Sequence, residues 1–131
     1  MKSLVTLAQA IFDIYRLQII KLLQIREMCV CELAESLGLS SPRMSQHLAI
    51  LRRANVVQER REGKWIYYAL IPKTLEEFNH AWNRLLEQPI NSVTDMKPVW
   101  KRLNSIDLEQ VKQACANVQK KTSLSKRKKA D

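Results

Sequence analysis

EMCVCELAESLGLSSPRMSQHLAILRR, residues 27–53, is the stretch that decides the fold. Apolar residues recur at helical spacing over residues 30–37, and Gly38 follows where a helix end often takes the left-handed conformation. Ser40 or Ser41 can cap the next helix, and the proline after them stands where a missing N–H costs little. The stretch therefore predicts two short helices joined by a tight turn.

The second of these helices has an apolar side and a polar side. At about 100° per residue, Met44, Leu48 and Leu51 fall together and predict the buried side. The opposite side holds Ser45, Gln46, Ala49 and Arg53, with Arg43 and His47 on one flank. Most of these side chains can donate or accept hydrogen bonds at base edges and phosphates, although any surface helix shows polar residues.

A β-hairpin is predicted directly after the second helix. Residues 56–60 and 65–70 are rich in β-branched and aromatic residues, and Gly63 lies in the turn between them. We expect this hairpin to be the only β structure in the chain. Its tip carries three cations, Arg60, Arg61 and Lys64. Such cations suit DNA phosphates, but a solvated turn is also commonly charged.

The remaining segments are predicted to be helical. Two amphipathic helices come first, and Asp13 is expected to cap the second of them. Thr74 is expected to cap a later helix, with Glu77 completing a capping box. A last helix is expected from about Val99 to about Lys120, with residues 105–107 as the place for a break.

The second half of this last helix carries an apolar seam. Leu108, Val111, Cys115 and Val118 are spaced alternately by three and four residues. Such spacing fits packing against another helix, so Cys115 is interpreted as a packing residue.

Composition limits the classes of protein that the chain can belong to. The 131 residues suffice for one domain, and 46% hydrophobic residues with two glycines indicate a mostly helical globule. The net charge is +9, but residues 1–119 carry only +4 of it. An odd count of three cysteines suits a reducing compartment. With no signal cleavage site and no membrane-spanning stretch in view, a cytoplasmic protein is predicted.

Two short helices followed by a hairpin predict a mainly α winged helix-turn-helix, in which the second helix enters the DNA major groove. Residues 7–72 resemble the ArsR/SmtB family of metal-sensing bacterial winged-helix repressors. The resemblance rests on CVCELAESLGLS, on the SxxxSQHLxxLR recognition helix and on the wing REGKWIYYAL. One departure is Asn55, where the family usually has glycine before the wing, and asparagine tolerates the same left-handed backbone.

The resemblance implies a homodimer, with the first and late helices at its interface, bound to an inverted repeat in double-stranded operator DNA. By position, it implies that Ser41, Arg43, Ser45, Gln46 and His47 face the groove, whereas the helical wheel puts His47 at the edge of the core. We divide the chain into a DNA-binding and dimerisation domain (residues 1–88), a C-terminal helical extension (89–119) and a basic disordered tail (120–131).

Cys29 and Cys31 form a candidate ligand site. Two residues apart, they lie about 200° apart around a helix but on one side of an extended segment, so both sulfurs reach one ion only if the helix start is irregular. Thiolates select soft ions such as As(III), Sb(III), Cd(II), Pb(II), Zn(II) or Cu(I). The plain alternative is two small hydrophobic residues at a helix start.

The resemblance is closest to the arsenic-sensing branch of the family, in which a third cysteine often follows. Here Ala34 takes that position, so Cys115 is a possible third ligand, beside a small external thiol or none. The zinc site that other members have in a late helix is rejected, because residues 74–88 offer only His80.

The sequence therefore predicts a repressor that leaves its operator when a thiophilic ion, foremost arsenite or antimonite, binds Cys29 and Cys31. One alternative is a winged-helix repressor with a redox or reactive-sulfur switch, and another is a nucleic-acid-binding protein without a sensor. No permanent cofactor is expected. An enzyme is not expected either, because no glycine-rich phosphate loop is present and neither His47 nor His80 has an evident carboxylate partner in the sequence.

Overall fold

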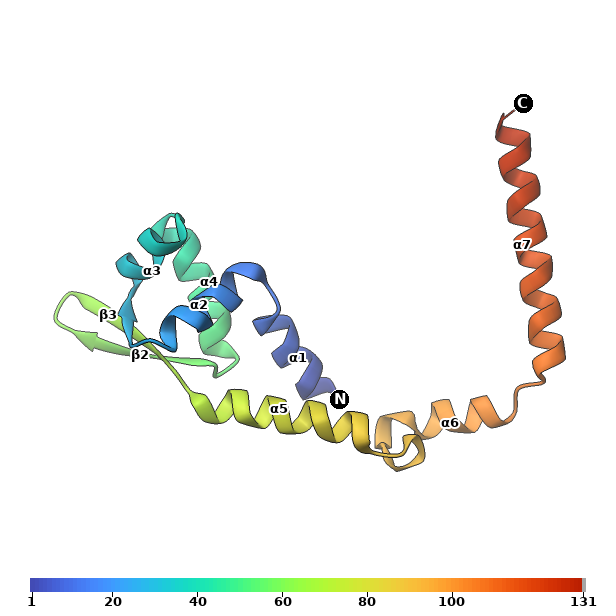
Figure 1. The fold of residues 1–131 in the computed structure, drawn as a ribbon, viewed down its shortest axis with the longest axis horizontal. Coiled ribbons are helices and arrows are strands. Elements are labelled where there is room, and N and C mark those ends of the chain that lie inside the picture. The colour runs from blue at the N-terminus through green and yellow to red at the C-terminus, as the bar shows by residue number, and fades with distance from the viewer. Residues whose placement is uncertain (131) are drawn as a thin grey trace. The chain divides into compact units, whose positions relative to one another are not determined.

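The computed structural model describes residues 1–130 and the side chains up to residue 128. The chain divides into two units, Met1–Glu87 and the residues from Gln88 onward. The first unit contains, in chain order, α1 (Lys2–Ile11), α2 (Ile14–Leu23), β1 (Met28–Cys29), α3 (Val30–Leu37), α4 (Ser41–Arg53), β2 (Val57–Glu62), β3 (Trp65–Leu70) and α5 (Pro72–Glu87) (Figure 1).

The helix boundaries of this unit follow from local capping. The Asp13 carboxylate accepts hydrogen bonds from the backbone N–H of Tyr15 at 2.9 Å and of Arg16 at 3.2 Å, as expected for the cap of α2. Gly38 ends α3 with a φ of 64°. The Ser40 hydroxyl accepts a hydrogen bond from the backbone N–H of Arg43 in α4 at 3.3 Å. Asn55 takes a φ of 61° before the wing. These predictions of helix ends are confirmed.

The core of the first unit lies beneath α4. Met44, Leu48 and Leu51 have no exposed surface, as the helical wheel predicted. They pack into one cluster whose other fully buried members are Ile19, Leu33, Val56 and Val57. Because these residues come from α2, α3, α4 and the start of the wing, burial of one side of α4 fixes which side faces solvent.

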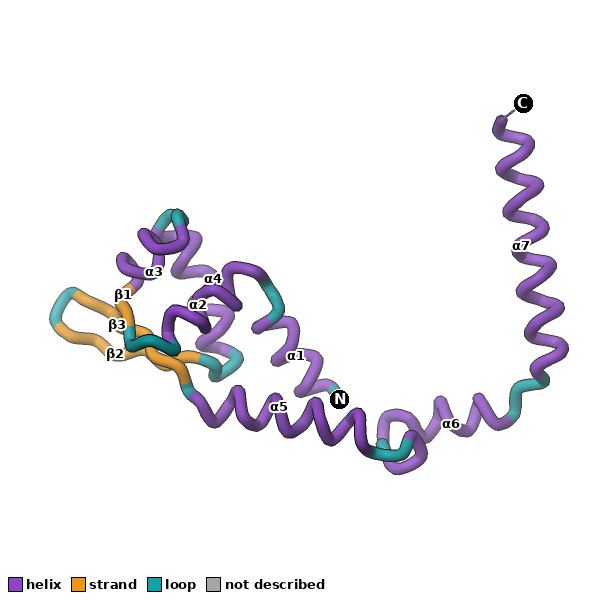
Figure 2. Tube along the Cα trace, in the orientation of Figure 1, coloured by secondary structure: helices purple, strands orange, loops and turns teal. Residues whose placement is uncertain are grey.

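A third strand joins the predicted hairpin. The sheet has the order β1-β3-β2, and the two-residue β1 pairs antiparallel with β3, so that Met28 lies opposite Tyr68 and Cys29 opposite Tyr67. Figure 2 shows β1 beside β3. The prediction that the hairpin is the only β structure was therefore wrong. A two-residue strand is too short to show the alternation by which strands are found in a sequence.

The start of α5 also differs from the prediction. The helix begins at Pro72, and Thr74 lies within its first turn rather than capping it. Proline is favoured at the first helical position. The Thr74 hydroxyl is buried and donates a hydrogen bond to the carbonyl of Asn55 at 2.6 Å. Thr74 therefore joins α5 to the turn that precedes the wing.

The second unit contains two short 3₁₀ helices, η1 (Ile90–Ser92) and η2 (Thr94–Met96), then α6 (Lys97–Asn104) and α7 (Leu108–Ala130). The break expected at residues 105–107 is present. Asp107 caps α7 by accepting from the backbone N–H of Glu109 at 3.1 Å.

Residues 120–130 differ from the expected disordered tail, because α7 continues through them to Ala130; Asp131 lies outside the described residues. The sequence after Pro98 contains no proline or glycine, and leucine, lysine, arginine and alanine are good helix formers. The seam predicted on this helix is exposed: 58% for Leu108, 43% for Val111 and 63% for Val118, with Cys115 exposed as well. Cys115 is therefore a packing residue only if another helix covers this seam.

Among the described helices, none alone is long and apolar enough to cross a membrane. The pair α1 and α2 would meet the length and composition needed, but the two are bent by 83° at their junction.

Candidate nucleic-acid interface and thiol site

The solvent-facing side of α4 carries most of the predicted DNA-contacting residues. Ser41, Arg43, Ser45, Gln46 and Arg53 are all exposed on this helix, and Ala49 is partly buried. The Arg43 guanidinium lies 5.7 Å from the centre of the Tyr15 ring, which supports its long side chain at one edge of the surface. The fixed core beneath α4 therefore presents short and long hydrogen-bonding side chains on one face.

His47 lies apart from this group, between α4 and the start of α2. Its side chain is only 16% exposed, and its Nδ1 lies 3.2 Å from a guanidinium nitrogen of Arg16 and 3.9 Å from the Asp13 carboxylate. Burial raises the pKa of Asp13, but the backbone N–H of Arg16, the Arg16 charge and the N–H of Tyr15 outweigh it and lower that pKa. His47 thus occupies the edge of the core, where the helical wheel put it.

The wing carries three cations in different surroundings. The Arg60 guanidinium forms ion pairs with Glu27 and, at 2.8 Å, with Glu62, and it lies 4.8 Å from the centre of the Tyr67 ring. The hydrogen bonds that the guanidinium donates to the carboxylate of Glu27, and then to that of Glu62, raise the pKa of Arg60. All three cations are exposed, but two carboxylates already balance the charge of Arg60.

The two close cysteines lie on either side of a strand-to-helix junction. Cys29 ends β1 and is also the N-cap of α3, with extended backbone (φ −79°, ψ 163°) and 9% exposure. Cys31 lies in the first turn of α3 and is exposed. The two-residue spacing therefore does not require α3 to unwind, because only Cys31 belongs to the helix.

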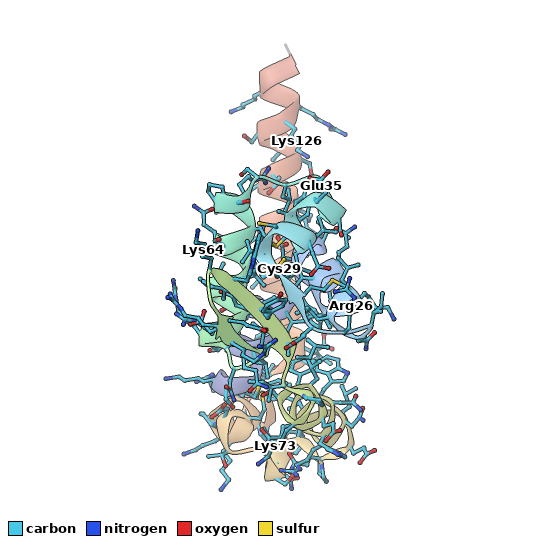
Figure 3. All side chains as sticks on the ribbon, turned by 90° about the vertical axis from the view of Figure 1, so that its left-hand side faces the viewer. Arg26, Cys29, Glu35, Lys64, Lys73 and Lys126 are labelled. Atoms are coloured by element: carbon cyan, nitrogen blue, oxygen red, sulfur yellow. The ribbon has the colours of Figure 1, made fainter. Side chains whose placement is uncertain are left out.

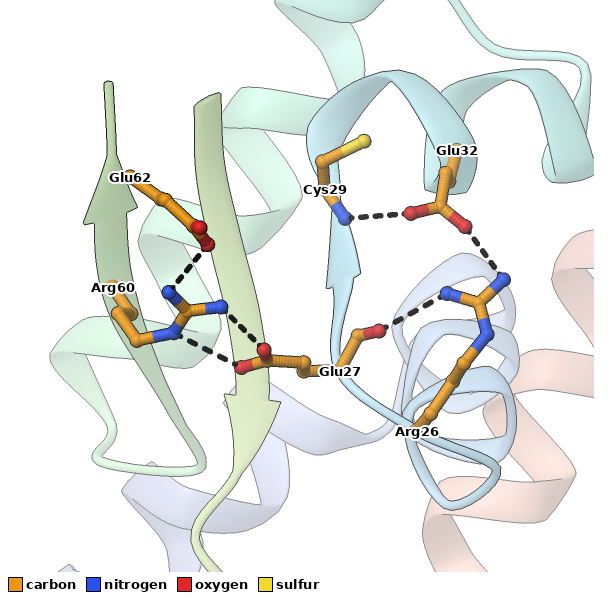
Figure 4. Close-up of polar contacts among 6 residues, drawn as sticks. All are labelled: Arg26, Glu27, Cys29, Glu32, Arg60 and Glu62. Carbon is orange, nitrogen blue, oxygen red and sulfur yellow. Dashed lines mark hydrogen bonds and ion pairs between the residues drawn. The ribbon is translucent and has the colours of Figure 1, made fainter. Parts of the chain in front are cut away.

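A chain of polar contacts holds this junction (Figure 4). Glu32 accepts a hydrogen bond from the backbone N–H of Cys29 at 3.4 Å and pairs with Arg26 at 2.6 Å. Arg26 also donates to the carbonyl of Glu27, whose carboxylate pairs with Arg60 on the wing. The backbone on the N-terminal side of the thiols is therefore fastened to both α3 and β2.

One hollow of about 270 Å³ brings the two cysteines together with residues of α4 and of the wing. It is lined by Cys29, Val30, Cys31, Ser45, Lys64, Trp65 and Ile66. In Figure 3, the labelled Cys29 and Lys64 lie on the side of the unit that faces the viewer. Both a residue of α4 and residues at the wing tip border the space next to the two sulfurs.

The donor set at this hollow suits a soft ion only in part. Cys29 and Cys31 offer two sulfur ligands, and Ala34, at the position where the resemblance to the arsenic-sensing branch led us to look for a third cysteine, is buried. Among residues 1–130 no three His, Cys, Asp or Glu side chains are grouped closely enough to hold a metal ion. Cys115 belongs to α7 in the second unit, and His80 is exposed on α5.

Reasoning from the sequence missed Arg26, Glu27 and Glu32. One signal could have found Glu32, because Cys29 and Glu32 have the spacing of a capping box, with cysteine in place of serine or threonine. The pairing of Glu27 with Arg60 joins residues 33 apart in the sequence. It depends on the register of β1 against β3, which no local pattern gives.

Acid should weaken the junction through Glu32. The Arg26 hydrogen bond, followed by the Cys29 N–H, lowers its pKa below the usual 4.5. A lowered carboxyl pKa stabilises the folded state fully above the unfolded value and loses that effect as the pH falls through the folded value. Unfolding midpoints in urea should therefore be higher for wild type than for Glu32→Gln above about pH 5, with a gap that closes in acid. A gap independent of pH would contradict this role.

Comparison with known proteins identifies the family. Residues 14–59 match the arsR family of bacterial regulatory proteins. The chain is 42% identical over 81 residues to the transcriptional activator HlyU of Vibrio cholerae, which covers 62% of this chain and 75% of HlyU. The chain belongs to the ArsR family. The solved structure of HlyU from Vibrio cholerae superposes on this chain with a TM-score of 0.54 and 35% identity, and the match covers 66% of this chain and 95% of HlyU.

Other members of the ArsR family add two findings. The arsenical resistance operon repressor of Escherichia coli is 41% identical over 69 residues, which are 52% of this chain and 59% of the repressor. A homodimeric winged helix-turn-helix domain from Mycobacterium bovis has a TM-score of 0.55 at 27% identity, over 66% of this chain and 83% of that domain. The matched stretch spans only 37% to 59% of the length of three arsenic-resistance regulators.

Proposed function

We propose that this chain is a transcriptional repressor of the ArsR family that leaves its operator when a thiophilic ion, foremost As(III) or Sb(III), binds at Cys29 and Cys31. The observation that carries the proposal is the shared hollow, in which both thiols lie beside Ser45 of the DNA-facing helix and Lys64 of the wing. The similarity to relatives named as an arsenic resistance transcriptional regulator and an arsenical resistance operon repressor supports the choice of ion.

DNA binding is assigned to the exposed face of α4 and to the wing tip. Ser45 and Gln46 have the donors and acceptors that base edges require, and we assign phosphate contacts to Ser41, Arg43 and Arg53, which are exposed on the same helix. On the wing we assign phosphate contacts to Arg61 and Lys64. Arg60 acts differently, because its two carboxylate partners make it a tether of the wing.

Release follows from the position of the thiols. An ion shared by both sulfurs draws the first turn of α3 towards the end of β1, and both elements contact the rest of the DNA-binding apparatus. Leu33 and Ala34 of α3 are buried in the same core as Met44 of α4. Cys29 is paired with the wing strand, and Glu27 is tied to Arg60. A coupling free energy of about 1–3 kcal/mol suffices for release.

The repressor acts as a homodimer in this proposal, in a reducing cytoplasm. Large apolar side chains on α1 and α5 are exposed in a single chain: 52% for Val5, 47% for Trp82 and 66% for Leu86. A second copy that covers them would give two recognition helices for the two halves of an inverted repeat. The homodimeric relative supports this arrangement.

The test begins with a duplex selected from random sequence by the full chain. As(III), Cd(II) and Zn(II) are then titrated into the complex formed by wild type, Cys29→Ser, Cys31→Ser or Cys115→Ser, and release is followed by fluorescence anisotropy. We expect As(III) to release wild type and Cys115→Ser, whereas Cys29→Ser and Cys31→Ser bind the duplex and stay bound. Absence of a selected duplex, or a complex insensitive to all three ions, would refute the proposal.

A redox switch is the second candidate. It is favoured by the pairing of one buried and one exposed free thiol with no third ligand at Ala34. One solved relative is described as reduced HlyU from Vibrio cholerae, which fits a relative whose oxidation state can change. Release by peroxide or polysulfide, together with no response to metal, would identify this mechanism instead.

A further inference from the structure

The C-terminal half of α7 has a concentration of positive charge without counter-charge. Residues 110–130 contain no aspartate or glutamate. The cations with described side chains, Lys112, Lys120, Lys121, Lys126, Arg127 and Lys128, are all exposed. These cations lie on helix α7, in a segment for which the sequence predicted a disordered tail.

Most of these cations share one face of the helix. At about 100° per residue, Lys120, Lys121, Arg127 and Lys128 fall within about 120° of one another. One shallow hollow is indeed lined by Lys120, Ser123, Leu124 and Arg127. The apolar seam that begins at Leu108 points about 160° away from this face. A partner helix on the seam would therefore leave the basic face open.

Several arginines of the first unit are, in contrast, already engaged. Arg26 pairs with Glu32, Arg52 with Glu59, and Arg60 with two carboxylates. Such pairs release fewer counterions on DNA binding, because their charge is balanced before the DNA arrives. The basic face of α7 has no aspartate or glutamate within residues 110–130 that could balance its charge in this way.

We propose that the face formed by Lys120, Lys121, Arg127 and Lys128 binds the phosphate backbone of duplex DNA next to the operator. The inference rests on the proposed DNA binding and extends it to a second contact surface. Phosphate contacts carry no sequence information, so this face adds affinity without changing which duplex is preferred. Four cations over two to three helical turns match a run of phosphates by charge, and no base contact is required of them.

The experiment measures the salt dependence of binding to the selected duplex. Lys120→Gln/Arg127→Gln removes two charges from the basic face, and Lys112→Gln/Lys126→Gln removes two from the seam side of the same helix as a matched control. Each neutralised phosphate contributes about −0.9 to the slope of log K against log salt. With two chains bound, we expect the face variant to lower the magnitude of the slope by about 2–4 and the control by less than about 1.

The duplex should also be long enough to extend beyond the selected sequence on both sides. Shortening it to the selected sequence should abolish the difference between the two variants. Equal slopes for the two variants on the long duplex would overturn the inference while leaving the proposed function intact. The inference would also be overturned if the face variant bound the duplex as wild type does but lost binding to single-stranded RNA or to anionic lipid vesicles. Absence of any selected duplex would instead count against the proposed function.

Discussion

Leu48→Ala should lower the free energy of unfolding by about 2–5 kcal/mol, a large share of the 5–15 kcal/mol typical of a domain. Leu48 has no exposed surface and lies at the middle of the buried side of α4. Leu48 belongs to a core cluster that also contains residues of α2, α3 and the wing, so its truncation leaves a cavity that these elements close only in part.

Urea unfolding followed by far-UV circular dichroism, at one fixed protein concentration, measures this loss. Ile25→Ala is the matched control, because Ile25 is 72% exposed and should change stability by less than about 0.5 kcal/mol. Equal midpoints for Leu48→Ala and Ile25→Ala would mean that α4 is not anchored as described. Leu48→Ala should also lose duplex binding near its urea unfolding midpoint, because the buried side of α4 holds its exposed side in position.

Gln46→Ala should weaken binding to the selected duplex by about 1–3 kcal/mol, roughly fivefold to 140-fold. Gln46 is exposed on α4, on the side opposite the buried leucines, and its amide can form two hydrogen bonds with one base edge. Loss of a base contact reduces specific binding but leaves the phosphate contacts in place.

Fluorescence anisotropy with the selected duplex and with a scrambled duplex of the same composition separates these effects. Gln46→Ala should lower affinity only for the selected duplex. Gln18→Ala, an exposed glutamine on α2, should bind both as wild type does. An equal loss on both duplexes would place Gln46 among phosphate contacts or among residues needed for folding.

Much of the first unit could be predicted because its signals are local. A left-handed position at Gly38, a serine before Pro42 and a three-to-four spacing of Met44, Leu48 and Leu51 each act within one or two turns of helix. The family resemblance agreed with these signals over the same residues. The two helices, the hairpin and the buried side of α4 were therefore all expected.

What could not be predicted depends on contacts between distant residues. The pairing of β1 with β3 and the ion pair of Glu27 with Arg60 arise only after the sheet has formed. The role of Thr74 likewise depends on a carbonyl 19 residues away. The end of α7 differs from the expectation for another reason. The polar composition of this segment suggested disorder, whereas the helix propensity of its residues favours a continued helix.

The pairing of Cys29 in β1 with Tyr67 in β3 has a practical consequence for engineering. A CVC segment moved alone into another winged-helix scaffold would carry the two sulfurs but not the strand that holds the first of them. Its anchors are spread over three places in the chain: Arg26 and Glu27 before it, Glu32 after it, and Arg60 on the wing. A transplant that is to keep the arrangement of the two thiols should therefore include the wing as well.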